Sequence, residues 1–311
     1  MAAATRSTPD YTVIDVPSGD SAVYLQGIVN HVTGGNGNVT VTGSTGATTI
    51  ALGNGNDIID ASGYGNVITL GNGNDIVHPG DGASQTTAGN GNDLVTLSGY
   101  GNTVMLGNGN DVVAGGDGAN SITLGDGNST VNLGGMGNRI TVGSGTNTIM
   151  AGSGSDNVVA GAGRDTIMLG GAGNHVVLNG SQANVTNQIG QDVITVNGGS
   201  DQFNFAGFGN QAIINGPAHA DIIDHGTGLT VSVNSSSQVD TISGFGNDTL
   251  GIVALANGVG DYHSVADIMS ALRSDGHGGT LLALGSGSNA GSIDFVDTAI
   301  SQLHASNFMI V

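Results

Sequence analysis

The stretch that decides the fold is Gly53-Asn54-Gly55-Asn56-Asp57, which is followed by the apolar pair Ile58-Ile59. The same glycine, asparagine and aspartate pattern returns at positions 71–75, 89–93 and 107–111, and the spacing between successive copies is constant. Partial copies continue this phase at 35–39, 125–129, 143–147 and 161–165. Self-similarity at a fixed period predicts a repeat architecture in which each copy is one structural unit.

A second row of polar residues lies halfway between these copies. It contains Asn66, Ser84, Asn102, Asn120, Asn138, Asp156, Asn174 and Asp192. The basic unit is therefore nine residues long, and two units make one turn of eighteen residues.

Apolar residues follow the same nine-residue period. The series is Val41, Ile50, Ile59, Ile68, Val77, Thr86, Val95, Val104, Val113, Ile122, Val131, Ile140, Ile149, Val158, Ile167, Val176, Val185, Ile194, Phe203 and Ala212. Strand alternation adds leucines two positions further on, such as Leu52, Leu70 and Leu97. Each unit is therefore predicted to be a glycine-rich turn and a short strand that points these residues inward. A flexible glycine-rich linker has no reason to keep such a register.

Composition excludes several classes of function. The 311 residues include 58 Gly and 24 Asp, with no Glu, Lys, Cys or Trp and only four Arg, so the formal net charge is -20. The missing residue types exclude a P-loop, an HExxH protease and thiol chemistry. Nucleic acid is not expected as a partner, because phosphate contacts need cations. Hard cations are expected instead, because aspartate oxygens suit calcium.

The consensus G-G-x-G-x-D-x-U-x is that of the RTX calcium-binding repeat, and residues 34–215 resemble it. The copy Gly161-Ala162-Gly163-Arg164-Asp165-Thr166-Ile167 is close to it, whereas Leu or Ala often replaces the first glycine of other copies. The resemblance implies an all-β fold: a right-handed parallel β-roll, a β-solenoid with two nonapeptides per turn and a small C-terminal α+β cap. The expected regions are an N-terminal arm or strand at 1–33, the roll at 34–237 and a C-terminal secretion or capping region at 238–311.

In this family calcium lies between successive turns, held by turn carbonyls and aspartates. The resemblance therefore implies these ligands: Asp57, Asp75, Asp93, Asp111, Asp156, Asp165, Asp192, Asp201, Gly53, Gly55, Gly71, Gly73, Gly89, Gly91, Gly107 and Gly109. The glycines are expected to supply positive φ angles. One edge carries aspartates in unbroken succession and the other mostly asparagines, whose ladder can hydrogen-bond without metal. We expect roughly four to eight calcium ions, each with six or more oxygen ligands.

The C-terminal part resembles the secretion region of RTX proteins. It has D-T-I-x-G-F at 240–245, a helix signal at Ser264 with Asp267, hairpin strands at 279–284 and 292–296, and L-x-A-S-x-F at 303–308. This implies type I secretion, with that export machinery as a partner, and an extracellular or cell-surface location without an N-terminal signal peptide. An ordinary solenoid cap is the alternative.

The leading hypothesis is a secreted, calcium-dependent structural protein that polymerises with itself into a filament, a biofilm matrix or a surface layer. Ile58, Ile76, Leu94 and Val112 are expected to face outward in successive turns, and Tyr11 with Val13 could add as a strand. Contact with another copy and coverage by the N-terminal segments 11–16 and 22–32 are the two explanations of this stripe.

Two other classes stay open. A row of outward threonines, Thr69, Thr87, Thr123 and Thr141, interrupted by Met105, suggests an adhesion or ice-binding module, with cell-surface polysaccharide as a candidate partner. A secreted hydrolase is the remote alternative. Asp221 and Asp224 beside His225 resemble an acid–base cluster, but a solvated turn explains them better.

Overall fold

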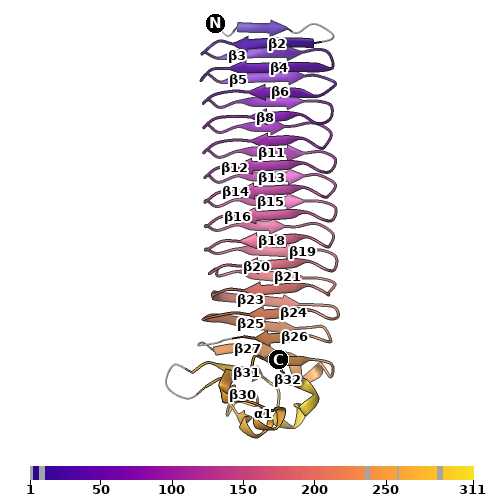
Figure 1. The fold of residues 1–311 in the computed structure, drawn as a ribbon, viewed down its shortest axis with the longest axis vertical. Coiled ribbons are helices and arrows are strands. Elements are labelled where there is room, and N and C mark those ends of the chain that lie inside the picture. The colour runs from indigo at the N-terminus through magenta and orange to yellow at the C-terminus, as the bar shows by residue number, and fades with distance from the viewer. Residues whose placement is uncertain (1–2, 7–10, 235–238, 258, 286–289) are drawn as a thin grey trace. The chain divides into compact units, whose positions relative to one another are not determined.

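The chain divides into two compact units in the computed structural model. The described residues are 3–6, 11–234, 239–257, 259–285 and 290–311. Unit 1 is Met1–Gly152 and unit 2 is Ser153–Val311, and each is described by itself. Both consist almost wholly of short strands (Figure 1), and the described residues include one α-helix, α1 (Val265–Ala271), in unit 2.

The strands of unit 1 alternate between two parallel sheets. The first sheet contains β1 (Ala3–Arg6), β3 (Ser21–Leu25), β5 (Val39–Gly43), β7 (Ile58–Ala61), β9 (Ile76–His78), β11 (Leu94–Leu97), β13 (Val112–Gly115), β15 (Thr130–Leu133) and β17 (Thr148–Met150). The second contains β2 (Tyr11–Val16), β4 (Val29–Gly34), β6 (Thr48–Ala51), β8 (Val67–Thr69), β10 (Gln85–Thr87), β12 (Thr103–Leu106), β14 (Ser121–Leu124) and β16 (Arg139–Val142). Residues one full repeat apart are partners in neighbouring coils, as in the pair Ile58 and Ile76. The predicted parallel β-solenoid with eighteen residues per turn is thus confirmed.

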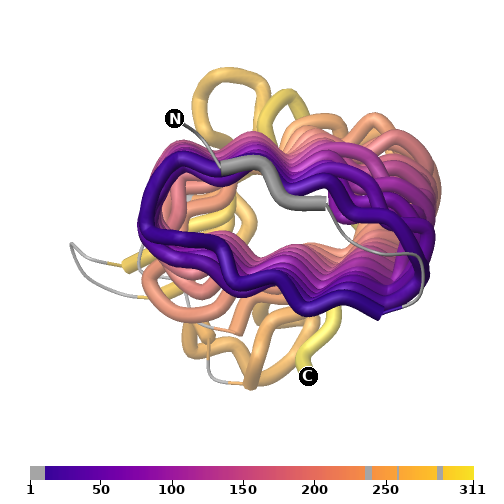
Figure 2. The backbone as a smooth tube through the Cα atoms, turned by 90° about the horizontal axis from the view of Figure 1, so that it is seen from above, coloured from indigo at the N-terminus to yellow at the C-terminus, as the bar shows by residue number. Residues whose placement is uncertain are grey.

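The core lies between the two sheets. Seen from above in Figure 2, each coil of unit 1 is a flattened ring with one strand on either long side. All twenty positions of the nine-residue apolar series are at most 1% exposed, and leucines such as Leu52 and Leu97 are buried beside them. The predicted inward face is therefore correct in both units. Burial of these rows supplies the hydrophobic stabilisation of every coil.

Unit 2 repeats the arrangement with coils that become longer towards the C-terminus. Its first sheet contains β19 (Thr166–Leu169), β21 (Asn184–Asn187), β23 (Gly199–Phe205), β25 (Ala218–Asp224), β27 (Val239–Ser243), β31 (Ser292–Val296), β30 (Thr280–Ala283) and β29 (Arg273–Ser274). Its second contains β18 (Asn157–Ala160), β20 (His175–Leu178), β22 (Val193–Val196), β24 (Gln211–Ile214), β26 (Thr230–Val233), β28 (Ile252–Leu255) and β32 (Phe308–Ile310).

The C-terminal strands of unit 2 extend its two sheets. β31 pairs parallel with β27, and β32 pairs parallel with β28. The predicted hairpin is present as the antiparallel pair β30 and β31, although its predicted turn lies partly outside the described residues. The predicted helix is α1, whose N-cap Ser264 accepts a hydrogen bond from the backbone N–H of Asp267.

The N-terminal segments belong to the coils of unit 1. β2 pairs with β4 and β3 pairs with β5, both parallel. Residues 11–33 of the predicted arm therefore take part in the same stack, while the predicted domain boundaries remain predictions. These segments extend the sheets instead of lying across them, so they do not cover the outward stripe at Ile58 and its neighbours. That alternative explanation is wrong for the described residues.

Candidate metal sites on the two turn edges

Unit 1 has two turn edges, one on each side of its sheets. The first edge leads from the second sheet to the first and contains the aspartate turns 52–57, 70–75, 88–93 and 106–111. The second edge leads back and contains the turns 62–66, 80–84, 98–102 and 116–120.

The aspartates of the first edge form a ladder in which each carboxylate accepts a hydrogen bond from the preceding coil. Oδ1 of Asp75 accepts the backbone N–H of Asp57 at 2.8 Å, and Oδ1 of Asp93 accepts that of Asp75 at 2.9 Å. Oδ1 of Asp111 accepts the backbone N–H of Asp93 at 3.0 Å. All four carboxylates, beginning with Asp57, are only 1–2% exposed. Each aspartate thus replaces a backbone acceptor for the coil before it.

The second carboxylate oxygen of this ladder is the unusual atom. Oδ2 is buried and has no hydrogen-bond partner at Asp57, Asp75 and Asp111. Burial raises the pKa of Asp57 and Asp75 to about 6, against the lowering effect of the backbone hydrogen bonds. Burial also raises the pKa of Asp93 to about 7, and repulsion from Asp75 and Asp111 adds to it. Uncompensated buried carboxylates are costly, so this row requires protons or cations.

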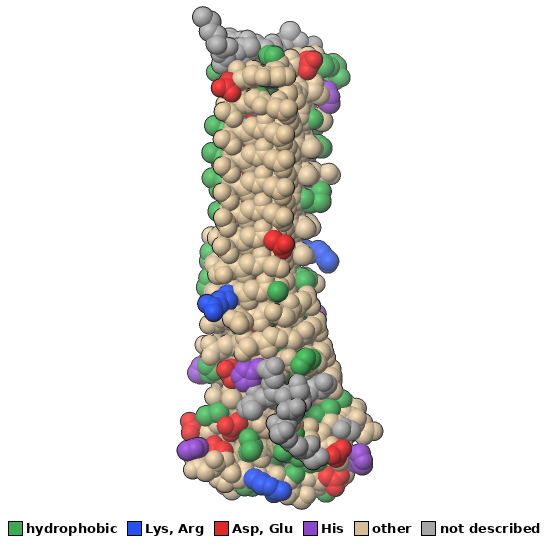
Figure 3. Space-filling model, turned by 90° about the vertical axis from the view of Figure 1, so that its left-hand side faces the viewer, with side chains coloured by type: hydrophobic (Ala, Val, Ile, Leu, Met, Phe, Trp, Pro, Cys, Tyr) green, Lys and Arg blue, Asp and Glu red, His purple; other side chains and the backbone are tan. Residues whose placement is uncertain are grey.

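Two rows of asparagines lie outside this ladder, and each side-chain oxygen accepts a hydrogen bond from the following coil. Oδ1 of Asn54 accepts the N–H of Asn72 at 2.8 Å, and Oδ1 of Asn56 accepts that of Asn74 at 2.8 Å. These amides tie each coil to the next without charge. In the space-filling view of Figure 3, few red acidic side chains show along the stacked coils, in keeping with carboxylates that lie beneath the surface.

On the second edge, both the oxygen and the nitrogen of the asparagine side-chain amide have hydrogen-bond partners. Oδ1 of Asn66 accepts the N–H of Thr48 at 2.8 Å, while its Nδ2 donates to the carbonyl oxygens of Ser62 and Pro79. Asn102 repeats this pattern, with Nδ2 donating to Ser98 O at 3.0 Å. A neutral amide therefore closes these turns without metal, as the sequence predicted for this edge.

One asparagine in the aspartate phase of the first edge allows a direct comparison. Oδ1 of Asn147 accepts the N–H of Ser129 at 3.0 Å, as the ladder aspartates do for their neighbours, and Nδ2 donates to Gly143 O at 3.4 Å. An aspartate with the same Oδ1 contact has Oδ2 in place of Nδ2 and has no hydrogen to donate. In such a turn the carboxylate Oδ2 and the turn carbonyl oxygen are both acceptors, and neither can donate a hydrogen. A hard cation is the group that suits both oxygens.

The glycines of the first edge have a different role from the one expected. The positive-φ residues include Gly63 and Gly65 on the second edge but none of the eight predicted ligand glycines. Close stacking explains these instead, because a Cβ at Gly91 would lie 1.6 Å from Gly73 O. The expectation of positive φ is thus wrong for these eight glycines, whereas it is right for Gly63 and Gly65 and for Gly127 in a later turn of the first edge.

The predicted ligands of unit 2 fall into a sparser pattern. Asp165 and Asp201 are both buried in the aspartate phase, with Ala183 on the coil between them. Oδ1 of Asp201 accepts the N–H of Ala183 and the Ser181 hydroxyl at 2.7 Å each, and its Oδ2 has no partner. Burial raises the pKa of Asp201 to about 6. Carboxylates two coils apart cannot share a cation between adjacent turns, so the paired arrangement is confined to unit 1 among these residues.

Sequence reasoning missed Asp240, which continues this row. Its Oδ1 accepts the N–H of Ala220 at 2.9 Å. The coils here are longer, because Asp201 pairs with Ala220 and Asp221 with Thr241. A search that allows the period to lengthen in this part of the chain would have found it.

The two aspartates predicted on the second edge phase have hydrogen-bond donors. Oδ2 of Asp192 accepts from Nδ2 of Asn187 at 2.7 Å, and its Oδ1 accepts from both the backbone N–H and Nδ2 of Asn174. Oδ2 of Asp156 accepts the N–H of Gly154 at 3.4 Å. The geometry at Asp192 therefore favours hydrogen bonding over metal ligation.

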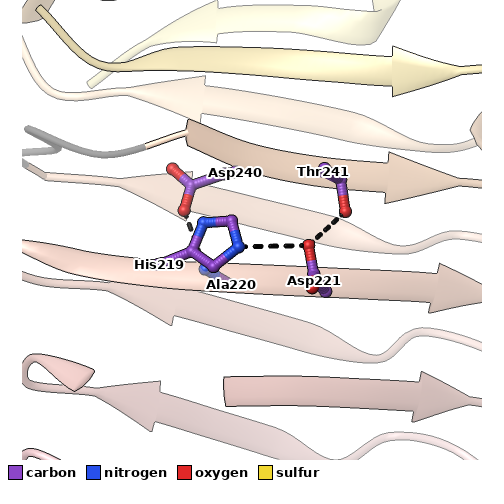
Figure 4. Close-up of polar contacts among 5 residues, drawn as sticks. All are labelled: His219, Ala220, Asp221, Asp240 and Thr241. Carbon is purple, nitrogen blue, oxygen red and sulfur yellow. Dashed lines mark hydrogen bonds and ion pairs between the residues drawn. The ribbon is translucent and has the colours of Figure 1, made fainter. Parts of the chain in front are cut away.

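The acid–base cluster noted in the sequence is not a solvated turn. Asp221 and Asp224 both lie on β25, and Asp224 is only 6% exposed. Figure 4 shows that Asp221 stands between two donors: His219 Nε2 lies 3.3 Å from Oδ1, and the Thr241 hydroxyl donates to the same oxygen at 2.5 Å. A histidine that activates a hydroxyl must lie between hydroxyl and carboxylate. In the group of His219, Asp221 and Thr241 the carboxylate is in the middle, so it does not have the order of a hydroxyl–histidine–carboxylate triad.

Cation binding on the first edge would draw mainly on backbone oxygens. In the part of the chain that the structure describes, no three His or Asp side chains meet as a ready ligand group. The residues nevertheless fit a hard cation, since Asp57, Asp75 and Asp111 each present an unpartnered buried oxygen beside a glycine-rich turn. Calcium accepts carbonyl and carboxylate ligands in flexible geometry.

No helix among the described residues is long and apolar enough to span a membrane.

Comparison with known proteins identifies the repeat. A sequence profile of the RTX calcium-binding nonapeptide repeat (4 copies) matches residues 29–59, 52–85, 96–131, 133–167 and 141–176. No curated protein and no solved structure matches the chain. The matches include Asp57, Asp75 and Asp111 of the ladder and the four turns of the second edge, whereas Asp93 lies between two matched ranges. Residues 29–176 of the chain therefore carry RTX repeats of the calcium-binding nonapeptide type.

Proposed function

We propose that this chain is a secreted, calcium-dependent structural protein whose copies assemble into an extracellular filament, biofilm matrix or surface layer. Proteins with RTX repeats are typically secreted. The calcium part of the proposal rests on the buried ladder Asp57, Asp75, Asp93 and Asp111 with its unpartnered oxygens. Calcium would be held there by these carboxylates and the carbonyls of the glycine turns, and it would neutralise the row.

The assembly part rests on one observation, an exposed aliphatic stripe on the first sheet of unit 1. Ile58, Ile76, Leu94 and Val112 are 42%, 38%, 37% and 37% exposed. They are direct partners in successive coils, so their side chains form one continuous row. A row of this kind is unfavourable in water and suits contact with another copy. The row continues as Thr130 and Thr148, which limits the apolar part.

The end of unit 1 offers a second contact for assembly. Among the described residues β2 is the terminal strand of its sheet, and it pairs with β4. Tyr11 and Val13 on this strand are 63% and 58% exposed. Unpaired strand edges are templates for another chain, and a head-to-tail contact that does not close generates a filament.

The ice-binding alternative has no such support. Met105 pairs with Thr87 on one side and Thr123 on the other, so it breaks the threonine row in register, and it is 48% exposed. A regular hydroxyl array is therefore absent from this part of the second sheet.

Sedimentation and electron microscopy with calcium test the proposal. The wild-type protein is expected to form polymers at high concentration, and Ile76→Asp with Leu94→Asp is expected to abolish their lateral thickening. Thr123→Asp with Thr141→Asp is the matched control, because it adds the same charge to the opposite sheet. A wild type that stays monomeric in calcium, or equal effects of both pairs, would overturn the assembly proposal. Detection of the protein in culture medium tests secretion separately.

A further inference from the structure

The second edge of unit 1 has a longer period than the first. Turns of one kind, Gly63-Tyr64-Gly65-Asn66 and Gly99-Tyr100-Gly101-Asn102, alternate with turns of another kind, Gly80-Asp81-Gly82-Ala83 and Gly116-Asp117-Gly118-Ala119. The backbone alternates with them. Gly63 and Gly65 have φ of 85° and 73° in the first kind, whereas Gly82 and Ala83 have 130° and 47° in the second. The repeat on this edge is thus two coils, the step from Tyr64 to Tyr100.

This alternation leaves large side chains exposed on every second coil. Tyr64 is 52% exposed, Tyr100 61% and Met136 64%. Gly82 lies on the coil between Tyr64 and Tyr100, and its lack of a side chain leaves room for the Tyr64 ring. A Cβ at Gly82 would lie 3.3 Å from Cε2 of Tyr64. The Tyr64 side chain therefore extends along the edge over Gly82 towards Tyr100, whose hydroxyl raises the pKa of Tyr64 by repulsion and hydrogen bonding.

Acidic side chains occupy the intervening coils. Asp81 and Asp117 are exposed, and their backbone N–H groups donate to Gly63 O and Gly99 O, directly before the two tyrosines. Asp81 also precedes Gly82, so its carboxylate lies next to the glycine that the Tyr64 ring crosses. The four turns contain no other charged residue. Aromatic and carboxylate groups thus alternate along this edge at the spacing of coils, about 5 Å.

We propose that the edge formed by Tyr64, Asp81, Tyr100 and Asp117 is a binding site for an uncharged polysaccharide. Tyrosine rings combine an apolar face with a polar hydroxyl, which suits the C–H faces of sugars. Carboxylates accept hydrogen bonds from sugar hydroxyls, and charge-assisted bonds of this kind are among the stronger ones. The backbone positions of the two tyrosines lie two coils apart, about 10 Å, so the aromatic surface that the two side chains form together is comparable in length with one disaccharide unit of an extended polymer.

Charge favours this occupant over the others. The edge offers carboxylates and no base in these turns, so an anionic polymer is repelled. A second copy that presented this same edge would bring its Asp81 and Asp117 against those of the first, and the carboxylates would repel each other. The proposal is independent of the aliphatic stripe, which lies on the first sheet.

Binding of defined polymers to the full-length protein in calcium tests the site. The probes are insoluble cellulose and chitin in pull-down, with hydroxyethyl cellulose and laminarin in affinity gels and alginate as the anionic comparison. Tyr64→Ala with Tyr100→Ala is expected to weaken binding to a neutral polymer at least about tenfold, from two lost aromatic contacts. Tyr64→Phe with Tyr100→Phe should keep most of the binding. The chain has five Tyr and no Trp, so tyrosine fluorescence reports binding directly.

Tyr24→Ala with Met105→Ala is the matched control, because each side chain is 48% exposed but lies on a sheet face. This control is expected to bind like the wild type, and circular dichroism verifies that every variant is folded. The proposal is wrong if the wild type binds none of the four neutral polymers, or if both alanine pairs lose binding equally. It is also wrong if the tyrosine pair changes only self-association, since the edge is then a contact between copies.

Discussion

The two turn edges of unit 1 solve the same problem with different chemistry. Both bury one polar side chain per coil, and in both its oxygen accepts the backbone N–H of the preceding coil. On the second edge the rest of the group is an amide that donates to a turn carbonyl, as Asn66 and Asn102 do. On the first edge it is a carboxylate oxygen without a donor, as at Asp57 and Asp75. A single atom therefore separates a self-sufficient turn from one that requires a cation.

Unit 2 adds an intermediate case. At the positions equivalent to the ladder aspartates, successive coils of unit 2 carry aspartate and alanine in turn. Buried carboxylates such as Asp201 are therefore separated by a coil. Repulsion between adjacent carboxylates, which contributes to the pKa of Asp93 in unit 1, is reduced by that spacing. We therefore expect unit 2 to depend less on calcium than unit 1.

The largest expected effect is that of calcium removal. Chelation with EGTA leaves the first edge with adjacent buried charges, and metal binding contributes directly to folding free energy. We expect loss of most of the β signal in circular dichroism at neutral pH, with recovery on adding calcium. Magnesium at the same concentration is the control, because it demands a smaller and more rigid site. Full thermal stability in EGTA would contradict the role assigned to the ladder.

Aspartates placed on the second edge test the role of the buried carboxylate directly. Asn102→Asp with Asn120→Asp puts uncompensated carboxylates on the second edge and is expected to cost about 3–5 kcal/mol without calcium. Part of that loss should return in calcium, measured by denaturant unfolding with and without the metal.

The reverse exchange should remove the calcium requirement locally. Asp75→Asn with Asp93→Asn replaces Oδ2 by a donor of the kind seen in Asn147, and is expected to stabilise the metal-free protein by about 1–3 kcal/mol. The number of bound calcium ions, measured by calorimetry, should fall. Unchanged stoichiometry in this variant would show that the ladder carboxylates are not ligands.

Stability without metal should fall as pH rises. Asp57, Asp75 and Asp93 have pKa values of about 6, 6 and 7 against an ordinary 3.8, so the folded state binds more protons than the unfolded chain in this window. The free energy of unfolding then decreases from about pH 4 to pH 7. Asp267 and Asp275, whose pKa is lowered by hydrogen bonds, act oppositely and only near pH 4 or below. Calcium should reverse the main trend, because its ligands must be deprotonated.

The smallest expected effect is that of a substitution at Asp192. Both of its oxygens accept hydrogen bonds, so Asp192→Asn places an amide against the Asn187 donor. We expect a loss of about 1–2 kcal/mol with unchanged calcium stoichiometry. Asp93→Asn, at which the stoichiometry should drop, is the control. A drop at Asp192 as well would restore it as a ligand, as the sequence predicted.

The architecture of this protein could be predicted from the sequence because it depends on local periodicity. A β-branched residue every ninth position can be buried only if each nonapeptide contributes one strand, and Val41 and Ile59 need no further information to be assigned inward. The aspartate row followed from the same register. The identity of a residue and its phase therefore determined the coil, the core and the buried carboxylates.

Contacts across coils were decided only by the tertiary structure. Whether a buried oxygen has a donor depends on atoms at least one coil away along the chain, so the sequence could not separate Asp192, with two partnered oxygens, from Asp75. Gly91 is required by the Gly73 carbonyl stacked against it and not by its own φ angle. The ring of Tyr64 likewise takes its place from Gly82 on the next coil. Periodicity sets which residues become neighbours, but the direction of each side chain along the stack depends on the space and the donors that the neighbouring coils leave.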